Sequence, residues 1–123
     1  MRLATIKQGE KEVAAVVTPA GMLPVGKISE KLNKAWKTEL FELIQSGQLA
    51  EMNQWYRAGG RQQLDAMAEF AVPKDKVRFG PLFRHPAKIW GIGLNYVDHA
   101  GDLAEKTPTV APASFAKFAT TIV

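Results

Sequence analysis

His99 and Asp102 are the two residues of this chain whose types and spacing first suggest catalysis. Residues three apart share one face of a helical turn, so the Asp102 carboxylate can accept a hydrogen bond from one imidazole nitrogen of His99. Such a bond fixes the tautomer and raises the basicity of the other nitrogen, which can then deprotonate water. The same spacing also occurs between unrelated surface residues, and for so short a pattern that is the more frequent outcome.

Lys117 is the second unusual side chain, because it interrupts the apolar segment ASFAKFATTIV. In a regular strand it shares one face with Phe115. A lysine there must extend to water, pair with an acid, or line a binding site. In a site, its cation can hold a substrate carboxylate or a developing enolate oxygen. The alternative is an ordinary edge-strand lysine, and periodicity does not choose between the two.

These residues belong to a longer pattern, KIWGIGLNYVDHAGDL followed by TPTVAPASFAKF. The pattern resembles the fumarylacetoacetate hydrolase family, whose members carry G-x-N-Y-x-x-H-A-x-E, a Pro-rich loop and then F-x-K. The two halves together are far more specific than either alone, and the upstream region resembles bacterial members more loosely. The matching positions are Gly93, Asn95, Tyr96, His99, Ala100, Phe115 and Lys117.

The resemblance implies a metal-dependent hydrolase that cleaves a C–C bond in a 1,3-dicarbonyl or 2-oxo acid, such as an acylpyruvate. In such enzymes Mg²⁺ (or Mn²⁺ or Ca²⁺) polarises the substrate and holds the leaving enolate. His99 would be the base, Asp102 its orienting partner, and Lys117 a stabiliser of a substrate oxygen. Asn95 and Tyr96 would shape the substrate pocket. Isomerase, decarboxylase or hydratase activity, and a non-catalytic binding or assembly module, remain alternatives; the family also implies a homodimer.

Two features depart from the family pattern. The acidic partner is Asp102, where the family usually has Glu. The family's metal ligands, an E-x-E pair and a later Asp, belong downstream of F-x-K, so we expect them after Val123 and none in this chain. Glu10 and Glu12 form an E-x-E before the motif, in a segment that predicts a solvated hairpin tip. Because the chain stops within an apolar run, we expect it to be the N-terminal part of a longer protein and inactive alone.

The elements that would position these residues predict an α+β fold, mostly β, in two regions. Residues 1–85 form a small α+β region, and residues 86–123 form the truncated beginning of a fumarylacetoacetate-hydrolase-type β-roll. In the first region, the alternating segment RLATI, the apolar run EVAAVV and the turns after each predict a β-meander, and helical spacing predicts short helices whose aromatic and Met side chains pack in a core. Thr38 is a candidate N-cap and Gly47 a stop. Strands are predicted at 2–6, 12–17, 22–25, 76–83, 88–95 and 113–123, with glycines in 88–95 that admit another backbone or a ligand.

Composition restricts the function further. There are no cysteines, so disulfides, thiolate metal sites and a cysteine nucleophile are excluded. The chain lacks a long uncharged apolar run and the pattern of a signal peptide, so we expect a cytoplasmic protein with no membrane partner. The formal charge is +4, with basic residues concentrated between Lys74 and Lys88. We interpret that stretch as a charged edge strand, and expect an oxo-acid substrate and no nucleic-acid partner.

Overall fold

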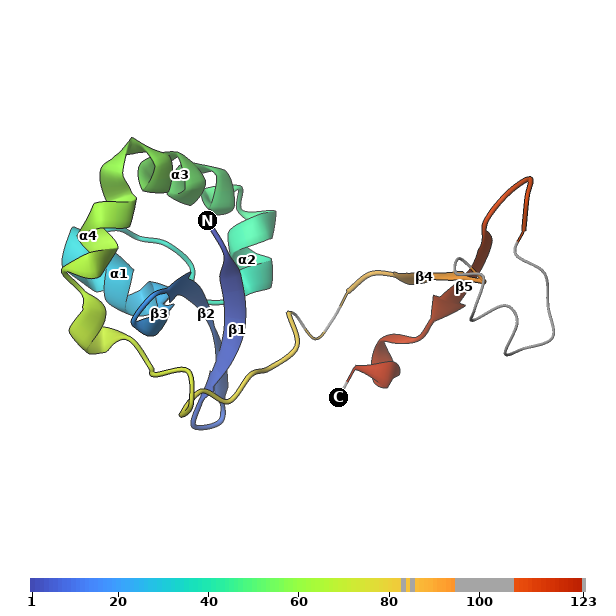
Figure 1. Ribbon diagram of the computed structural model, residues 1–123, viewed down its shortest axis with the longest axis horizontal. Helices are drawn as coiled ribbons and strands as arrows, with labels where there is room; N and C mark the ends of the chain where they lie inside the picture. The colour runs from blue at the N-terminus through green and yellow to red at the C-terminus, as the bar shows by residue number, and fades with distance from the viewer. Residues whose placement is uncertain (83, 85, 95–107, 123) are drawn as a thin grey trace. The chain divides into compact units, whose positions relative to one another are not determined.

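The computed structural model describes residues 1–82, 84, 86–94 and 108–122 (Figure 1). The chain divides into two compact units, Met1–Phe83 and Arg84–Val123. Antiparallel sheets occur together with α-helices, which confirms the predicted α+β class. Among the described residues of the first unit, helices contain at least as many residues as strands, so the predicted mostly β fold is not seen there. No helix in the described part is long and apolar enough to cross a membrane.

A three-stranded antiparallel sheet in the order β1–β2–β3 forms the centre of the first unit. Its strands are β1, Leu3–Gln8, β2, Lys11–Thr18, and β3, Gly21–Pro24. A tight turn joins β1 to β2 and sets a register in which Leu3 pairs with Val16. At the second hairpin Thr18 pairs with Gly21. The predicted meander is therefore confirmed. Because successive side chains of a strand point to opposite faces, the neighbouring buried residues Ala15 and Val16 of β2 belong to two different cores.

Helices gather on one face of this sheet (Figure 1). They are α1, Val25–Leu32, α2, Leu40–Gln45, α3, Gln48–Trp55, and α4, Arg61–Asp65, with a wide turn at Tyr56–Gly60 and a 3₁₀ turn at Ala68–Phe70. Between helices and sheet lies a core in which Leu23, Ile28, Leu43 and Met52 are fully buried. The rings of Trp36 and Trp55 meet there at 5.3 Å. The expectation that these aromatic and Met residues pack is confirmed.

Two helix starts differ from the sequence-based prediction. Helix α1 was not expected, and it begins directly after Pro24, whose extended backbone ends β3. Thr38 is not the N-cap of α2: its carbonyl accepts a 2.7 Å hydrogen bond from the Ala14 amide, and the helix starts after Glu39, whose own backbone is extended. Gly47 ends the helix as predicted, with a left-handed φ of 74°.

The opposite face of the sheet is covered by residues 72–82, which we call the strap. Val72 pairs with Met22 through two hydrogen bonds of 2.9 Å at the edge of β3. Farther along, the carbonyl of Arg78 accepts a 2.7 Å hydrogen bond from the amide of Lys7 at the edge of β1. A second, smaller core lies under the strap and contains Ile6, Ala15, Met22, Val72 and Val77. The sheet is thus held between helices and strap.

The strap takes the place of the strand predicted at 76–83. Among the described residues of the predicted strand, 76–82, Phe79 alone forms a β-bridge, an isolated one to Ile6. Pro73 and Pro81 have no backbone N–H to donate to a ladder, and the amide of Lys76 bonds the Pro73 carbonyl at 3.0 Å to close a turn. The interpretation of the basic stretch as a charged edge strand is therefore wrong for its first part, which is a turn.

The second unit contains a two-stranded antiparallel sheet of β4, Ile89–Gly93, and β5, Ala113–Lys117. The strand predicted at 88–95 is confirmed at Ile89–Gly93, and the strand predicted at 113–123 is confirmed in its first five residues only. A 3₁₀ turn, Ala119–Thr121, follows it. Both the hydroxyl and the amide of Thr121 donate to the Phe118 carbonyl, at 2.8 and 3.0 Å. This local bonding competes with the strand ladder and ends it.

Candidate functional site

The β4–β5 hairpin brings together two halves of the motif that lie far apart in the sequence. Its register places Gly91 opposite Phe115 and Ile89 opposite Lys117. Because side chains alternate along a strand, Phe115 and Lys117 lie on the sheet face that also carries Gly91 and Gly93. The prediction that Phe115 and Lys117 share a face is confirmed.

Gly91 makes room for the ring of Phe115. A Cβ atom at Gly91 would lie 2.6 Å from Cε2 and 2.9 Å from Cε1 of that ring, which is too close for real atoms. At Gly93 the nearest ring atom would be 3.6 Å away, an ordinary contact. We expected another backbone or a ligand over these glycines, whereas a side chain of the neighbouring strand lies there.

Lys117 is exposed and stays beside this ring. Its Nζ lies 5.7 Å from the ring centroid of Phe115, within the range of a cation–π contact. Phe115 keeps 45% of its surface exposed. The two side chains therefore offer a cation next to accessible aromatic surface, which suits an anion with a short carbon skeleton.

The other end of the hairpin is marked by Leu94, which has a φ of 52°. A left-handed backbone is uncommon for a bulky residue and costs about 1–2 kcal/mol. A hollow of about 330 Å³ lies here, lined by Gly93, Leu94 and residues 108–112. Because Lys117 is at the far end of β5, roughly 13 Å away at strand spacing, the described residues do not bring Lys117 to this hollow.

Four of the predicted site residues, Asn95, Tyr96, His99 and Asp102, lie outside the described residues. Their roles stay predictions. The strands that flank them in the sequence are described, and these strands pair with each other. The structure therefore describes the strands that precede and follow the predicted base in the sequence, and not the base itself.

The described residues do not fit a metal site. Mg²⁺ requires several oxygen ligands, and no group of three or more His, Asp or Glu side chains that could hold a cation occurs in the described part of the chain. Glu10 is exposed in the β1–β2 turn, and Glu12 lies in β2. Ligands for the Mg²⁺ that the resemblance implies would have to come from other residues.

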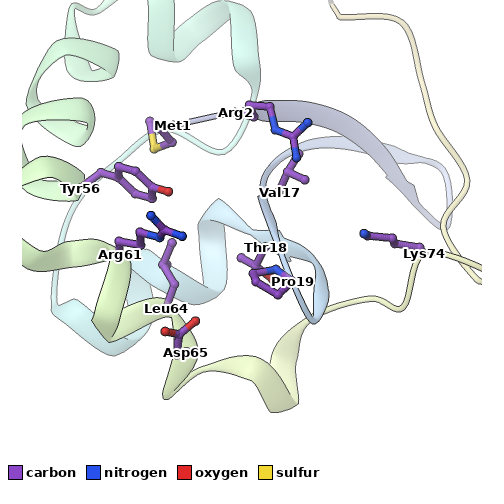
Figure 2. A pocket seen from close by; sticks show the side chains of 10 residues that line it. All are labelled: Met1, Arg2, Val17, Thr18, Pro19, Tyr56, Arg61, Leu64, Asp65 and Lys74. Atoms are coloured by element: carbon purple, nitrogen blue, oxygen red, sulfur yellow. The ribbon is translucent and has the colours of Figure 1, made fainter.

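A second concave surface, of about 370 Å³, lies in the first unit (Figure 2). Arg2, Tyr56, Arg61 and Lys74 are among the residues that line it. They come from the residue before β1, the turn between α3 and α4, the start of α4 and the strap. Sequence reasoning missed this group because no local spacing connects the four segments. The only signal was the excess of basic residues that begins at Lys74.

Comparison with known proteins finds no matching family model, no matching curated protein and no matching solved structure. The likeness to the fumarylacetoacetate hydrolase family therefore rests on the motif residues themselves.

Proposed function

We propose that this chain is the N-terminal part of a hydrolase of the fumarylacetoacetate hydrolase family, which cleaves a C–C bond in a 1,3-dicarbonyl or 2-oxo acid. The observation that supports it is the register of β4 and β5. This register places the two halves of the motif on neighbouring strands, with Phe115 opposite Gly91 and Lys117 opposite Ile89. Gly91 precedes the matched positions, and its lack of a side chain makes room for the ring of Phe115, which is one of them.

The face of the hairpin that carries Phe115 and Lys117 offers what a small oxo acid needs. The ring can contact the carbon skeleton, and the ammonium can stabilise negative charge on a carboxylate or enolate oxygen. Apart from Lys117, no acid–base side chain is described on this face, so the proton transfers are assigned to the predicted pair His99 and Asp102.

In the proposed reaction His99, oriented by Asp102, removes a proton from water as the oxygen adds to the acyl carbonyl carbon. The C–C bond then breaks, and its electron pair leaves as the enolate of the oxo acid. Lys117 stabilises the enolate oxygen, and protonation of the enolate carbon completes the reaction. An acylpyruvate and water thus give a carboxylic acid and pyruvate. No step is assigned to Mg²⁺, because the described residues do not hold it.

As part of the proposal, the β4–β5 hairpin is the start of a β-roll. Isolated two-stranded hairpins are at best marginally stable in water. Trp90 and Ile92 lie on the face opposite Lys117, and 67% and 60% of their surfaces are exposed. Further strands of the proposed roll would cover this apolar face.

The activity is tested on the protein that contains residues 1–123 together with the reading frame that follows them. Cleavage of acetylpyruvate is followed by the loss of its enol absorbance, with Mg²⁺ and with a chelator. His99→Ala should lower kcat about 10²- to 10⁴-fold, the usual contribution of a general base, with a much smaller effect on KM. Lys117→Met should lower kcat/KM, whereas Lys88→Met, which removes an exposed lysine just before β4, should not.

An unchanged kcat in His99→Ala would remove this residue from the mechanism. Isomerisation, decarboxylation or hydration of the substrate would select an alternative activity of the same family. An interrupted E-x-E after Val123, with no turnover, would favour the non-catalytic module.

Mg²⁺ binding by the 123-residue chain gives an independent measurement. We expect calorimetry to detect no tight, stoichiometric binding, because the described carboxylates do not cluster. Tight binding at one ion per chain would show that this segment holds its own metal site and would contradict the expected ligands downstream.

A further inference from the structure

We propose that the cavity of the first unit binds a small organic anion that carries a carboxylate or phosphate group. Its volume of about 370 Å³ is within the range of small-molecule sites. The cavity is formed entirely by residues of Met1–Phe83, so the proposal does not depend on the hydrolase activity proposed for the β4–β5 hairpin.

The charge of the lining favours an anion. Arg2, Arg61 and Lys74 contribute three positive charges and Asp65 one negative charge, which leaves +2. Among the described residues none of these three cations takes part in an ion pair, although Asp65 follows Arg61 by one helical turn. Unneutralised cations that line a concave surface raise the local concentration of anions. An arginine also presents a planar fork of donors that matches carboxylate and phosphate oxygens.

The cations approach the cavity from different segments (Figure 2). Tyr56 and Arg61 lie next to each other on one side of the lining, and Lys74 lies across the segment that carries Val17, Thr18 and Pro19, with its ammonium directed toward that segment. A ligand beside Arg61 can therefore meet a charged and a neutral donor together, while Lys74 adds positive charge from another side.

Apolar side chains form part of the remaining wall, which favours an organic ligand over a bare inorganic ion. Leu64 is buried and Val17 half-buried along this wall, and the half-buried ring of Tyr56 adds aromatic surface. A ligand with a short carbon skeleton would remove apolar surface from water at this wall, which stabilises the complex in proportion to the area covered. We therefore expect a skeleton of metabolite size behind the acidic group.

An interruption between α3 and α4 allows Tyr56 and Arg61 to line the same cavity. In an uninterrupted α-helix, residues five positions apart point about 140° away from each other. Here Gly59 has a φ of 109°, which interrupts the helix between α3 and α4. At Gly60 a Cβ atom would lie 2.5 Å from the ring of Trp55, so the tight path also requires glycine there. The Gly59–Gly60 pair thus shapes one wall of the cavity.

The test uses the 123-residue chain and three probes: phenyl phosphate, phenylacetate and inorganic phosphate. Amide chemical shifts are followed by NMR during titration at low ionic strength. We expect saturable shifts around residues 56–65 and at Lys74, with tighter binding of phenyl phosphate than of inorganic phosphate. Arg61→Gln should weaken phenyl phosphate binding about 10- to 100-fold, the usual effect of losing a charge-assisted hydrogen bond.

Arg57→Gln is the matched control, since it removes the same charge from the turn before α4 but from a residue outside this cavity. It should leave the affinity within about twofold, whereas Lys74→Gln, in a different segment, should weaken it as Arg61→Gln does. Equal losses in Arg57→Gln and Arg61→Gln would overturn the proposal, because they would reflect general surface charge. Absence of saturable shifts with every probe would also overturn it. Equal affinities for phenyl phosphate and inorganic phosphate would contradict the proposal that the ligand is organic. Tighter binding of phenyl phosphate or of phenylacetate shows whether the acidic group of the ligand is a phosphate or a carboxylate.

Discussion

Gly21→Ala probes the contact that holds the strap against the sheet. Gly21 has a φ of 139°, which residues with side chains rarely adopt. A Cβ atom there would overlap the carbonyl oxygen of Val72 and lie 2.8 Å from its carbonyl carbon. Since the obstructing atoms are backbone, relief requires the strap to move, which breaks the two 2.9 Å hydrogen bonds between Met22 and Val72.

The expected magnitude follows from these two effects. Backbone strain at such a position costs roughly 1–3 kcal/mol, and each lost hydrogen bond costs about 0.5–1.5 kcal/mol net. Together they should lower the free energy of unfolding by about 2–6 kcal/mol, a large part of the roughly 5–15 kcal/mol typical of a small domain. Lys74 lies two residues beyond Val72, so phenyl phosphate binding should weaken as well.

Urea unfolding followed by tryptophan fluorescence measures the effect, because Trp36 and Trp55 both lie in the first unit. Gly9→Ala is the control: Gly9 also has a positive φ, of 61°, but nothing lies within 4 Å of the added Cβ. It should therefore cost only the left-handed backbone, about 1–2 kcal/mol. If Gly21→Ala destabilises the protein no more than Gly9→Ala does, the contact with Val72 is not what requires glycine at this position.

Two spectroscopic predictions test other contacts. The hydrogen bond that Lys27 Nζ donates at 2.8 Å, together with the charge of Lys27, holds the pKa of Glu30 below its ordinary value of 4.5. The stabilisation that this pair gives the folded state is present at pH values above the unfolded-state pKa of Glu30, and it is lost as the pH falls through the folded-state pKa. Lys27→Gln should raise the pKa of Glu30 toward 4.5 in a carboxyl NMR titration. An unmoved pKa would contradict the assignment to Lys27. In the second unit, the α-protons of Gly91 should show ring-current shifts that disappear in Phe115→Leu and persist in Phe118→Leu, since Phe118 is 82% exposed; their persistence in Phe115→Leu would mean that Phe115 does not lie over Gly91.

The meander and the facing of Lys117 could be predicted because each depends on short local signals. A strand-like segment at 2–6 and an apolar run at 12–17 stand on either side of a Gly-containing turn, and the shared face of Phe115 and Lys117 follows from the two-residue period of a strand. Gly47 was predictable for a similar reason, since a left-handed backbone after a helix selects glycine.

Helix α1 and the strap could not be predicted in this way. Helix α1 has eight residues, of which only Val25, Ile28 and Ser29 are buried, and no side chain caps its start. So short a segment has too few apolar positions to distinguish a helical period from a strand. The strap is fixed by single bridges at two separate sheet edges, which are tertiary contacts that its own sequence does not encode.

The two candidate sites also differ in how far the sequence alone could predict them. The hairpin motif is nearly contiguous within each half, so its residues could be named from the sequence, and only the register that joins the halves required a structure. The cavity of the first unit combines side chains from four segments with a break at Gly59. The helix is interrupted at Gly59, and the strap is distant in the sequence. No regular spacing of residues therefore predicts that these side chains meet at one cavity.

The strap also determines when the first unit can finish folding. The hydroxyl of Thr5 donates to the Leu82 carbonyl at 2.9 Å across a separation of 77 residues, whereas the β1–β2 and β2–β3 hairpins need only neighbouring segments. Local pairings form early, and contacts between distant residues wait for the slower closure of a long loop. During synthesis the sheet therefore emerges with its β1 edge open, and an exposed edge can pair with another chain. Release of residue 82 from the ribosome ends that interval, so a chain cut before residue 72 would keep an aggregation-prone edge.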